Sequence, residues 1–284
     1  MLASDSVLTC SCVDTKRYED LDANGFLRYR NKKPIILRNA VPANLISQCV
    51  PSDCFTLQQT QSNASIEVLK ALDNENFIDN PLYTNKEVMH LKTFLTEFTG
   101  RSGQGSGPRL YCRTHVSTLL LNKLKLFDMF ERLLPQAPVK PDLMRTWISH
   151  QGSTTPLHYD RCHGFLVQLR GRKRFVLVSH EESDSVYQCD GVHGPTHASR
   201  VRGIGKCFSD LQELDSEYVD QLLSRYKKMQ RAEIFIADLG PGDVVYTPPG
   251  WWHEVTSVDD SISLTIPWDM NAAEMQHIPA NMAF

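Results

Sequence analysis

Short apolar runs separated by turn residues dominate the second half of the chain. These runs hold about five residues each, and they are Met144–Ser149, Phe165–Leu169, Arg174–Val178, Ile234–Ala237, Val244–Thr247 and Ser261–Ile266. Runs of this length, punctuated by Gly, Pro and Asp, are typical of strands in a β-barrel or sandwich. Residues 165–178 predict a hairpin that turns near Gly171.

Longer stretches with helical spacing precede and interrupt the apolar runs. Residues 45–100 predict helix with interruptions, most clearly over 86–98, where apolar side chains recur every three or four positions. Two further core helices are predicted over 116–134 and 208–228. The segment KPIILRNAV, residues 33–41, predicts a buried strand that its proline can only open. The pattern as a whole predicts a mainly β fold with flanking helices.

Composition places the chain among ordinary globular proteins. Its 284 residues are 41% hydrophobic and 22% charged, and the formal net charge of -3 gives no general attraction to nucleic acid or anionic membrane. The sequence has no apolar run long enough to span a membrane and no secretory signal. Its eight cysteines are scattered, which favours free thiols in a reducing compartment. We therefore expect a cytoplasmic or nuclear protein that does not enter membranes.

The pattern of apolar runs and helical stretches predicts one domain over residues 1–284. We expect an N-terminal elaboration of helices and strands over 1–143, a barrel core over 144–269 and a short tail over 270–284. The Gly/Ser-rich segment RSGQGSGP, residues 101–108, predicts a flexible loop. It does not mark a domain boundary, because the residues after it complete the site described below.

The triplet His158-Tyr159-Asp160 is the first candidate for chemistry. In a strand, residues i and i+2 point to the same face, so the imidazole and the carboxylate project together. Alone the signal is weak, since a hydrogen-bonded surface pair is the more common reason for such a triplet.

A second imidazole donor stands in GDVVYTPPGWWHEV, residues 242–255, where His253 follows a rigid Pro-Pro-Gly turn. A lone histidine at such a place is normally a core or edge residue. Two imidazoles and one carboxylate, however, are the ligand set that leaves three adjacent positions open on Fe(II). O₂ activation with a chelating cosubstrate needs such open positions.

Lys173 follows His158 by fifteen residues, on the return strand of the predicted hairpin. A cation inside a barrel is costly unless it is paired, and a dicarboxylate would pair it. The alternative is an exposed lysine in the basic run 170–174.

Together these segments resemble a known family. TTPLHYDRCHGFLVQLRGRKRFVLV, residues 154–178, followed about 65 residues later by PGDVVYTPPGWWHEV, resembles the JmjC hydroxylases. The likeness is strongest to small members typified by the asparaginyl hydroxylase that inhibits hypoxia-inducible factor and by the tRNA wybutosine hydroxylase. It covers residues 24–270 and is dense only over 145–180 and 240–268.

The resemblance implies a double-stranded β-helix of the jelly-roll or cupin type, with iron near one mouth. It implies that the Fe(II) ligands are His158, Asp160 and His253. It also implies that Lys173 binds the distal carboxylate of 2-oxoglutarate, and that Thr155 donates a hydrogen bond to it. These roles are expectations for the structure to test.

Two further positions follow from the resemblance. Tyr111, in RLYCRTH, stands where such enzymes often place a tyrosine that faces the cosubstrate carboxylate. Gly164 stands where relatives often carry an asparagine, which removes one polar contact to the cosubstrate. His163 or Gln168 would have to compensate.

The function implied is that of an oxygenase that consumes 2-oxoglutarate and O₂ and releases succinate and CO₂. Hydroxylation of a protein side chain is the first choice, hydroxylation of a tRNA base the second and lysine demethylation the third. A cupin-like binding protein without catalysis, or a cupin that holds zinc or manganese, remains a different reading because fold alone does not establish function.

Partners and access complete the expectations. We expect a protein substrate, with tRNA as the alternative, and no dimer through C-terminal helices, because only sixteen residues follow Trp268. Two loops, residues 101–108 and 183–199, are expected to border the mouth that leads to the metal. The second loop contains His193 and His197, which we interpret as solvated loop histidines.

Overall fold

The computed structural model describes residues 8–55, 57–62, 64–78, 84–100, 107–135, 140–192, 194–209, 213–278 and 282. The strands of its smaller sheet are β1 (Thr9–Cys12), β8 (Thr154–Tyr159), β10 (Lys173–Val178), β11 (Glu233–Leu239) and β13 (Trp252–Ser257). The strands of its larger sheet are β2 (Thr15–Arg17), β3 (Ile35–Arg38), β4 (Ser65–Ala71), β5 (Thr84–His90), β6 (Tyr111–His115), β7 (Arg145–Ser149), β9 (His163–Arg170), β12 (Val244–Thr247) and β14 (Ser261–Trp268).

The helices are short and lie outside the strands. The α-helices are α1 (Ala23–Phe26), α2 (Ala43–Ile46), α3 (Leu57–Ser62), α4 (Leu91–Gly100), α5 (Thr118–Lys123), α6 (Leu126–Leu133), α7 (Ser216–Arg225) and α8 (Ala272–Met275). The 3-10 turn that matters below is η5 (Ile204–Cys207). No helix in the described part of the chain has the length and apolar character that crossing a bilayer requires.

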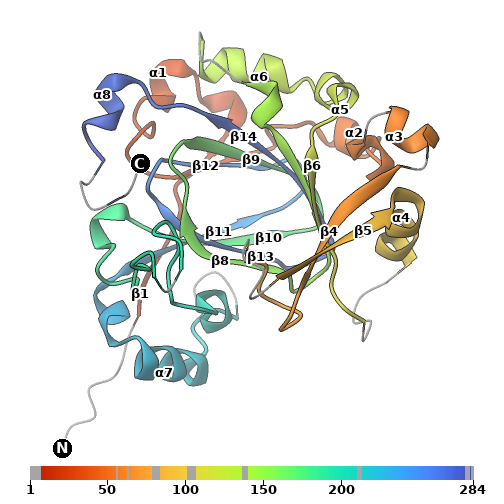
Figure 1. Cartoon of the computed structure of the whole chain (residues 1–284). Coiled ribbons are helices and arrows are strands. Elements are labelled where there is room, and N and C mark those ends of the chain that lie inside the picture. Colours follow the sequence, from red (N-terminus) through yellow and green to blue (C-terminus); the bar gives the residue numbers. More distant parts are fainter. Residues whose placement is uncertain are drawn as a thin grey trace, which may run out of the picture.

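The two sheets face each other, as Figure 1 shows. The smaller sheet has the strand order β1-β11-β10-β13-β8, and the larger has the order β2-β3-β12-β9-β14-β7-β6-β4-β5. Sequence neighbours such as β9 and β10 thus belong to opposite sheets, which is the winding of a double-stranded β-helix. The β-rich cupin-type fold with flanking helices that the sequence predicts is confirmed.

Helices cover the outer face of each sheet (Figure 1). Over the larger sheet, Phe26 of α1 packs edge-on against Tyr246 of β12 at 4.9 Å between ring centroids. Over the smaller sheet, Leu222 of α7 joins a buried cluster with Val176 and Trp252. Both outer faces are therefore closed by apolar contacts, and the two inner faces are left to form an interior.

Strand alternation decides which residues reach that interior. On β10, Val176 and Val178 belong to the cluster under α7, whereas Phe175 and Leu177 belong to the cluster between the sheets. Lys173 has the same parity as Phe175 and therefore also points inward. The sequence period of two thus divides each strand into a packing face and an interior face.

The strands predicted in the second half of the chain and over 33–41 are present. The prediction of a hairpin over 165–178 is wrong. The chain does turn at Gly171 with φ of 65°, but β9 pairs with β12 and β14 in the larger sheet, whereas β10 pairs with β11 and β13 in the smaller one. The prediction of helix over 86–98 is wrong in its first part. Residues 84–90 form β5, which pairs with β4 along its whole length and leaves Val88 78% exposed. The pairing supplies backbone hydrogen bonds that local spacing cannot reveal, and helix begins only at Leu91.

The other two helix predictions are right in type and wrong in extent. The stretch 116–134 is two helices, α5 and α6, which are separated where Lys125 adopts a left-handed φ of 53°. Over 208–228, α7 occupies only its central part, and a bridge joins Phe208 to Leu214 before the helix begins. The eight cysteines are all free thiols, as expected.

Candidate metal centre

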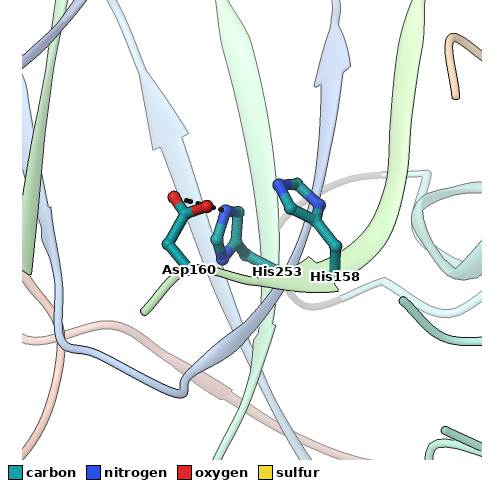
Figure 2. Close-up of side chains that lie close together, drawn as sticks. All are labelled: His158, Asp160 and His253. Atoms are coloured by element: carbon teal, nitrogen blue, oxygen red, sulfur yellow. Dashed lines mark ion pairs between the residues drawn. The ribbon is translucent and has the colours of Figure 1, made fainter. Parts of the chain in front are cut away.

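Two facing strands and the end of one of them bring together the three predicted metal ligands. His158 on β8 lies opposite His253 on β13, and Asp160 follows directly after β8. One ligand atom from each residue lies within 4.8 Å of the other two. The two imidazole centroids are 4.2 Å apart, and Nε2 of His253 lies 3.8 Å from Oδ2 of Asp160. Figure 2 shows the three side chains close together. The three ligand atoms therefore lie close enough together to bind one metal ion.

Hydrogen bonds to the backbone fix the tautomer of both histidines. Nδ1 of His158 lies 2.8 Å from the carbonyl oxygen of Pro156, and Nδ1 of His253 lies 3.0 Å from that of Trp251. A carbonyl oxygen only accepts, so each Nδ1 carries the hydrogen and each Nε2 keeps its lone pair. Both lone pairs are thus available to a metal.

Burial keeps His158 in the protonation state that binds a metal. Desolvation, followed by the like charge of His253, lowers the pKa of His158 to about 4, against the opposing effect of Asp160. His158 is therefore neutral at neutral pH, as a ligand must be. Asp160 has a 59% exposed side chain, and its carbonyl oxygen accepts a hydrogen bond from the amide of Gly250. That bond ties the Pro-Pro-Gly turn before His253 to the end of β8.

An irregularity in strand pairing turns Thr155 toward the site. His253 lies opposite His158, whereas Val255 lies opposite Thr155. Between these two pairs β8 advances by three residues and β13 by only two. Such a bulge reverses the alternation of the strand. Thr155 therefore shares the inner face with His158, although regular alternation would place it on the outer one. Pro156, which has no amide hydrogen to donate, stands inside the bulge.

Lys173 lies deeper on the same inner face. It is 2% exposed, and its Nζ donates to Oγ of Ser263 on β14 at 2.9 Å. No carboxylate among the described residues forms an ion pair with it, and burial lowers its pKa to about 7. The alternative of a solvent-exposed lysine is wrong. Ser263 could not be found from local sequence, because its contact with Lys173 spans ninety positions.

Tyr111 and Thr155 meet between the sheets. The hydroxyl of Tyr111 on β6 lies 2.9 Å from Oγ1 of Thr155. Burial raises the pKa of Tyr111 to about 12, so the phenol stays protonated and can donate. The structure thus brings the upstream tyrosine to the residue beside which the resemblance placed it.

Gly164 leaves open space in the interior. A Cβ built there meets no atom within 4 Å. The two residues suggested as compensation are engaged elsewhere. His163 points to the helical side of β9, with Nδ1 2.8 Å from the hydroxyl of Tyr246. The amide nitrogen of Gln168 donates to Oγ of Ser261 and to two backbone carbonyls. Neither replaces the missing asparagine.

The longer predicted loop does border the ligands. The amide of Tyr159 donates to the carbonyl of His197 at 2.9 Å, and Ala198 forms a bridge with His158. The residue His197 is partly open to solvent, and the partial desolvation of its ring, followed by the charge of His158, lowers its pKa. His193 and most of the segment 101–108 lie outside the described residues.

Comparison with known proteins now decides the family. A family model described as a cupin-like domain matches residues 28–274. The chain belongs to this family. The match extends over both sheets and includes all three residues of the His158 site. The cupin-like family also accounts for the winding of the strands.

Several curated relatives carry the JmjC name. The chain is 29% identical to Jumonji C domain-containing protein 5 of Drosophila melanogaster over 126 residues, 44% of this chain and 27% of that protein. It is 26% identical to lysine-specific demethylase 8 of Xenopus tropicalis over 125 residues, 44% of this chain and 25% of that protein. It is 24% identical to JmjC domain-containing protein F of Dictyostelium discoideum over 205 residues, 66% of this chain and 43% of that protein.

The chain spans about a quarter of the length of the first two of these relatives. These partial matches establish that the cupin-like chain is a distant homologue of JmjC proteins. The closer likeness to the hypoxia-inducible-factor and wybutosine hydroxylases stays a prediction.

The residues present fit the groups that the family implies. Two imidazoles and one carboxylate suit Fe(II) with open coordination positions. A buried lysine, with no acid paired to it in the described part of the chain, suits the far carboxylate of a dicarboxylate.

Proposed function

We propose that this chain is an Fe(II)- and 2-oxoglutarate-dependent oxygenase in which His158, Asp160 and His253 hold the metal. One observation carries the proposal: three converging ligand atoms and an unpaired buried lysine lie on one interior face. A structural cupin has no need for either feature. Keeping an uncompensated cation away from water is costly, which favours a function for it.

When bound, Fe(II) and 2-oxoglutarate would supply the oxidative decarboxylation that yields succinate and CO₂ and puts one oxygen atom of O₂ into a C–H bond of the substrate. The chain orients this chemistry. The backbone carbonyls of Pro156 and Trp251 hold the two imidazoles with Nε2 toward the metal. Neighbouring strands and the helical layer exclude water from the inner end of the site.

Residues of the interior would bind the cosubstrate through a lysine and two hydroxyl groups. Lys173 lies four residues deeper on β10 than Leu177, which pairs with His253, a separation of about 13 Å along the strand. This spacing leaves room for a five-carbon dicarboxylate between the metal and Nζ. Within the Tyr111–Thr155 pair one hydroxyl donates to the other, and the second hydroxyl would donate to the same carboxylate; both arrangements require the phenol to stay protonated.

The substrate proposed is a protein side chain that becomes hydroxylated. Lysine demethylation is the second candidate, because a relative from Xenopus tropicalis is named lysine-specific demethylase 8. It would use the same hydrogen abstraction on an N-methyl group. Hydroxylation of a tRNA base is the alternative with a different partner.

The test is succinate release from 2-oxoglutarate by the purified chain with Fe(II) and ascorbate. The wild type should release succinate slowly without substrate, and Asp160→Ala should not. His90→Ala, which removes an exposed imidazole on β5, is the matched control for His253→Ala and should behave as wild type. No succinate from the folded wild type, or equal release from Asp160→Ala, would refute the proposal.

A further inference from the structure

A group of basic residues lines the larger sheet across from the metal centre. Strand β6 begins at Tyr111, whose hydroxyl reaches Thr155, so the inner face of β6 looks into the site. Two and four residues later, Arg113 and His115 share that face. Strand β7 pairs with β6 so that Trp147 lies opposite Arg113.

The next pair in this register completes the group. Arg145 lies opposite His115, and Trp147 donates from its indole nitrogen to Oγ1 of Thr265 at 2.8 Å. Arg113, His115, Arg145 and Trp147 form one continuous surface, here called the basic rim.

Strand direction places the basic rim at the level of the ligands. At the inner end, Oγ of Ser149 on β7 lies 2.7 Å from Oγ of Ser257 on β13, and Ser257 pairs with Lys173. From that end β6 and β8 both run outward, because β6 is antiparallel to β7, which ends at Ser149, and β8 is antiparallel to β13, which ends at Ser257. Asp160 therefore lies at the outer end of β8, and Arg113 and His115 lie toward the outer end of β6.

The guanidinium of Arg145 is held in place with one edge unused. Its Nη1 donates to the carbonyls of Asp142 at 2.6 Å and Met144 at 2.8 Å, and lies 3.1 Å from Nδ1 of His115. Its Nε and Nη2 form no hydrogen bond within the described residues. That edge is the fork that binds a carboxylate through two parallel hydrogen bonds.

Within the described residues, the positive charge of the rim has no ion-pair partner. Arg113 lies over the ring of Trp147, 5.6 Å from its centroid, and neither arginine forms an ion pair with a described carboxylate. On the adjoining hairpin, the carboxylate of Glu67 pairs with Lys86. Burial, and then the charge of Arg113, lowers the pKa of Arg145, against the opposing effect of Asp142.

We propose that the basic rim binds an acidic side chain of a peptide substrate and thereby places a neighbouring residue over the metal. The proposal rests on the oxygenase function proposed above and names its substrate class. A peptide carboxylate is favoured over nucleic acid because the positive charge is confined to one site. The chain as a whole carries a net charge of -3, and Lys140 beyond the rim is paired with Asp269. A track of phosphates would need an extended basic surface.

The first test reads the charge of the rim without iron or activity. Trp147 is half-buried, while Trp251, Trp252 and Trp268 are 5%, 0% and 1% exposed, so a collisional quencher reports on Trp147. Iodide should quench wild-type fluorescence several-fold more strongly than caesium at equal ionic strength. Arg113→Glu should reverse this order. Equal quenching by the two ions in the wild type would overturn the proposal.

The second test uses two peptide libraries that differ only in Asp/Glu against Asn/Gln around a random central residue. Oxygen incorporation, read by mass spectrometry, should favour the acidic library about tenfold, as expected for one partly desolvated ion pair. Arg145→Gln should abolish the preference. Arg132→Gln, which alters an arginine stacked on Tyr18 far from the site, is the matched control and should keep it.

The outcomes separate this proposal from the oxygenase function. Succinate release without peptide tests the oxygenase function, and the acidic preference tests the rim. Equal oxidation of both libraries, oxidation of neither, or rim-dependent oxidation of tRNA instead would overturn the peptide proposal. A preference that survives in Arg145→Gln would also overturn it.

Discussion

Replacing Lys173 by methionine should stabilise the chain while removing its cosubstrate site. Burial lowers the pKa of Lys173 from 10.5 to about 7, so the folded state holds this proton less tightly than the unfolded state. With about 1.36 kcal/mol per pKa unit, the folded protein carries a penalty of about 4 kcal/mol at pH 7. Methionine has a similar volume and no charge.

The measured gain should be smaller than this penalty. Lys173→Met also removes the hydrogen bond to Ser263, which costs about 1 kcal/mol. We therefore expect the free energy of unfolding to rise by about 2–3 kcal/mol at pH 7. The assay is urea unfolding with EDTA present and without 2-oxoglutarate.

The pH dependence identifies the cause. The unfolded state binds more protons between pH 7 and 10.5, so wild-type stability gains from Lys173 as pH rises through that window. At pH 9.5 the charge penalty falls to about 1 kcal/mol, and the advantage of Lys173→Met should largely vanish. Added 2-oxoglutarate with a redox-inert metal should stabilise the wild type only. A variant less stable than wild type at pH 7, or an advantage independent of pH, would refute the reasoning.

Three further predictions concern Lys173, Glu254 and Gly164. The dissociation constant of 2-oxoglutarate should rise above pH 7, up to tenfold per pH unit, because the dianion binds the protonated form of Lys173, and calorimetry should detect proton uptake; affinity that is flat from pH 7 to 9 would argue against a role for this lysine. Glu254→Gln should destabilise the fold by about 2 kcal/mol, because the buried carboxylate accepts amide hydrogens from Gly203 and Gly205 at 3.2 and 2.7 Å, and urea unfolding within error of wild type would contradict this. Gly164→Asn should change stability by less than about 1 kcal/mol, since a Cβ there meets open space, and a large loss of stability would show that the space is filled.

Local sequence was sufficient for the parts of the site that depend on local spacing. The two-residue separation of His158 and Asp160 predicts a shared face on any strand. His253 stands behind a turn whose Pro-Pro-Gly sequence allows few conformations. Lys173 follows the turn at Gly171, although β10 joins the sheet opposite to β9 and does not pair with it.

Contacts between distant strands were beyond local reasoning. The bulge that turns Thr155 inward exists only in the pairing of β8 with β13. The spacing of apolar residues over 86–98 predicts helix where β5 is a strand. Local spacing does not show β4, which lies some twenty residues earlier and contributes the backbone hydrogen bonds of β5. Arg113 and Arg145 had no motif, and their joint position depends on the register of β6 with β7. Alternation gives the face of a residue, but register decides its neighbours.

The most direct test of the central claim is anaerobic absorption spectroscopy of the chain with Fe(II) and 2-oxoglutarate. Fe(II) chelated by a 2-oxo acid in a protein site acquires a visible charge-transfer band. The wild type and His90→Ala should develop this band and saturate at one iron per chain, and Asp160→Ala and His253→Ala should not. A folded wild type that develops no band, or a band that survives either ligand substitution, would contradict the assignment of His158, Asp160 and His253 as the metal site.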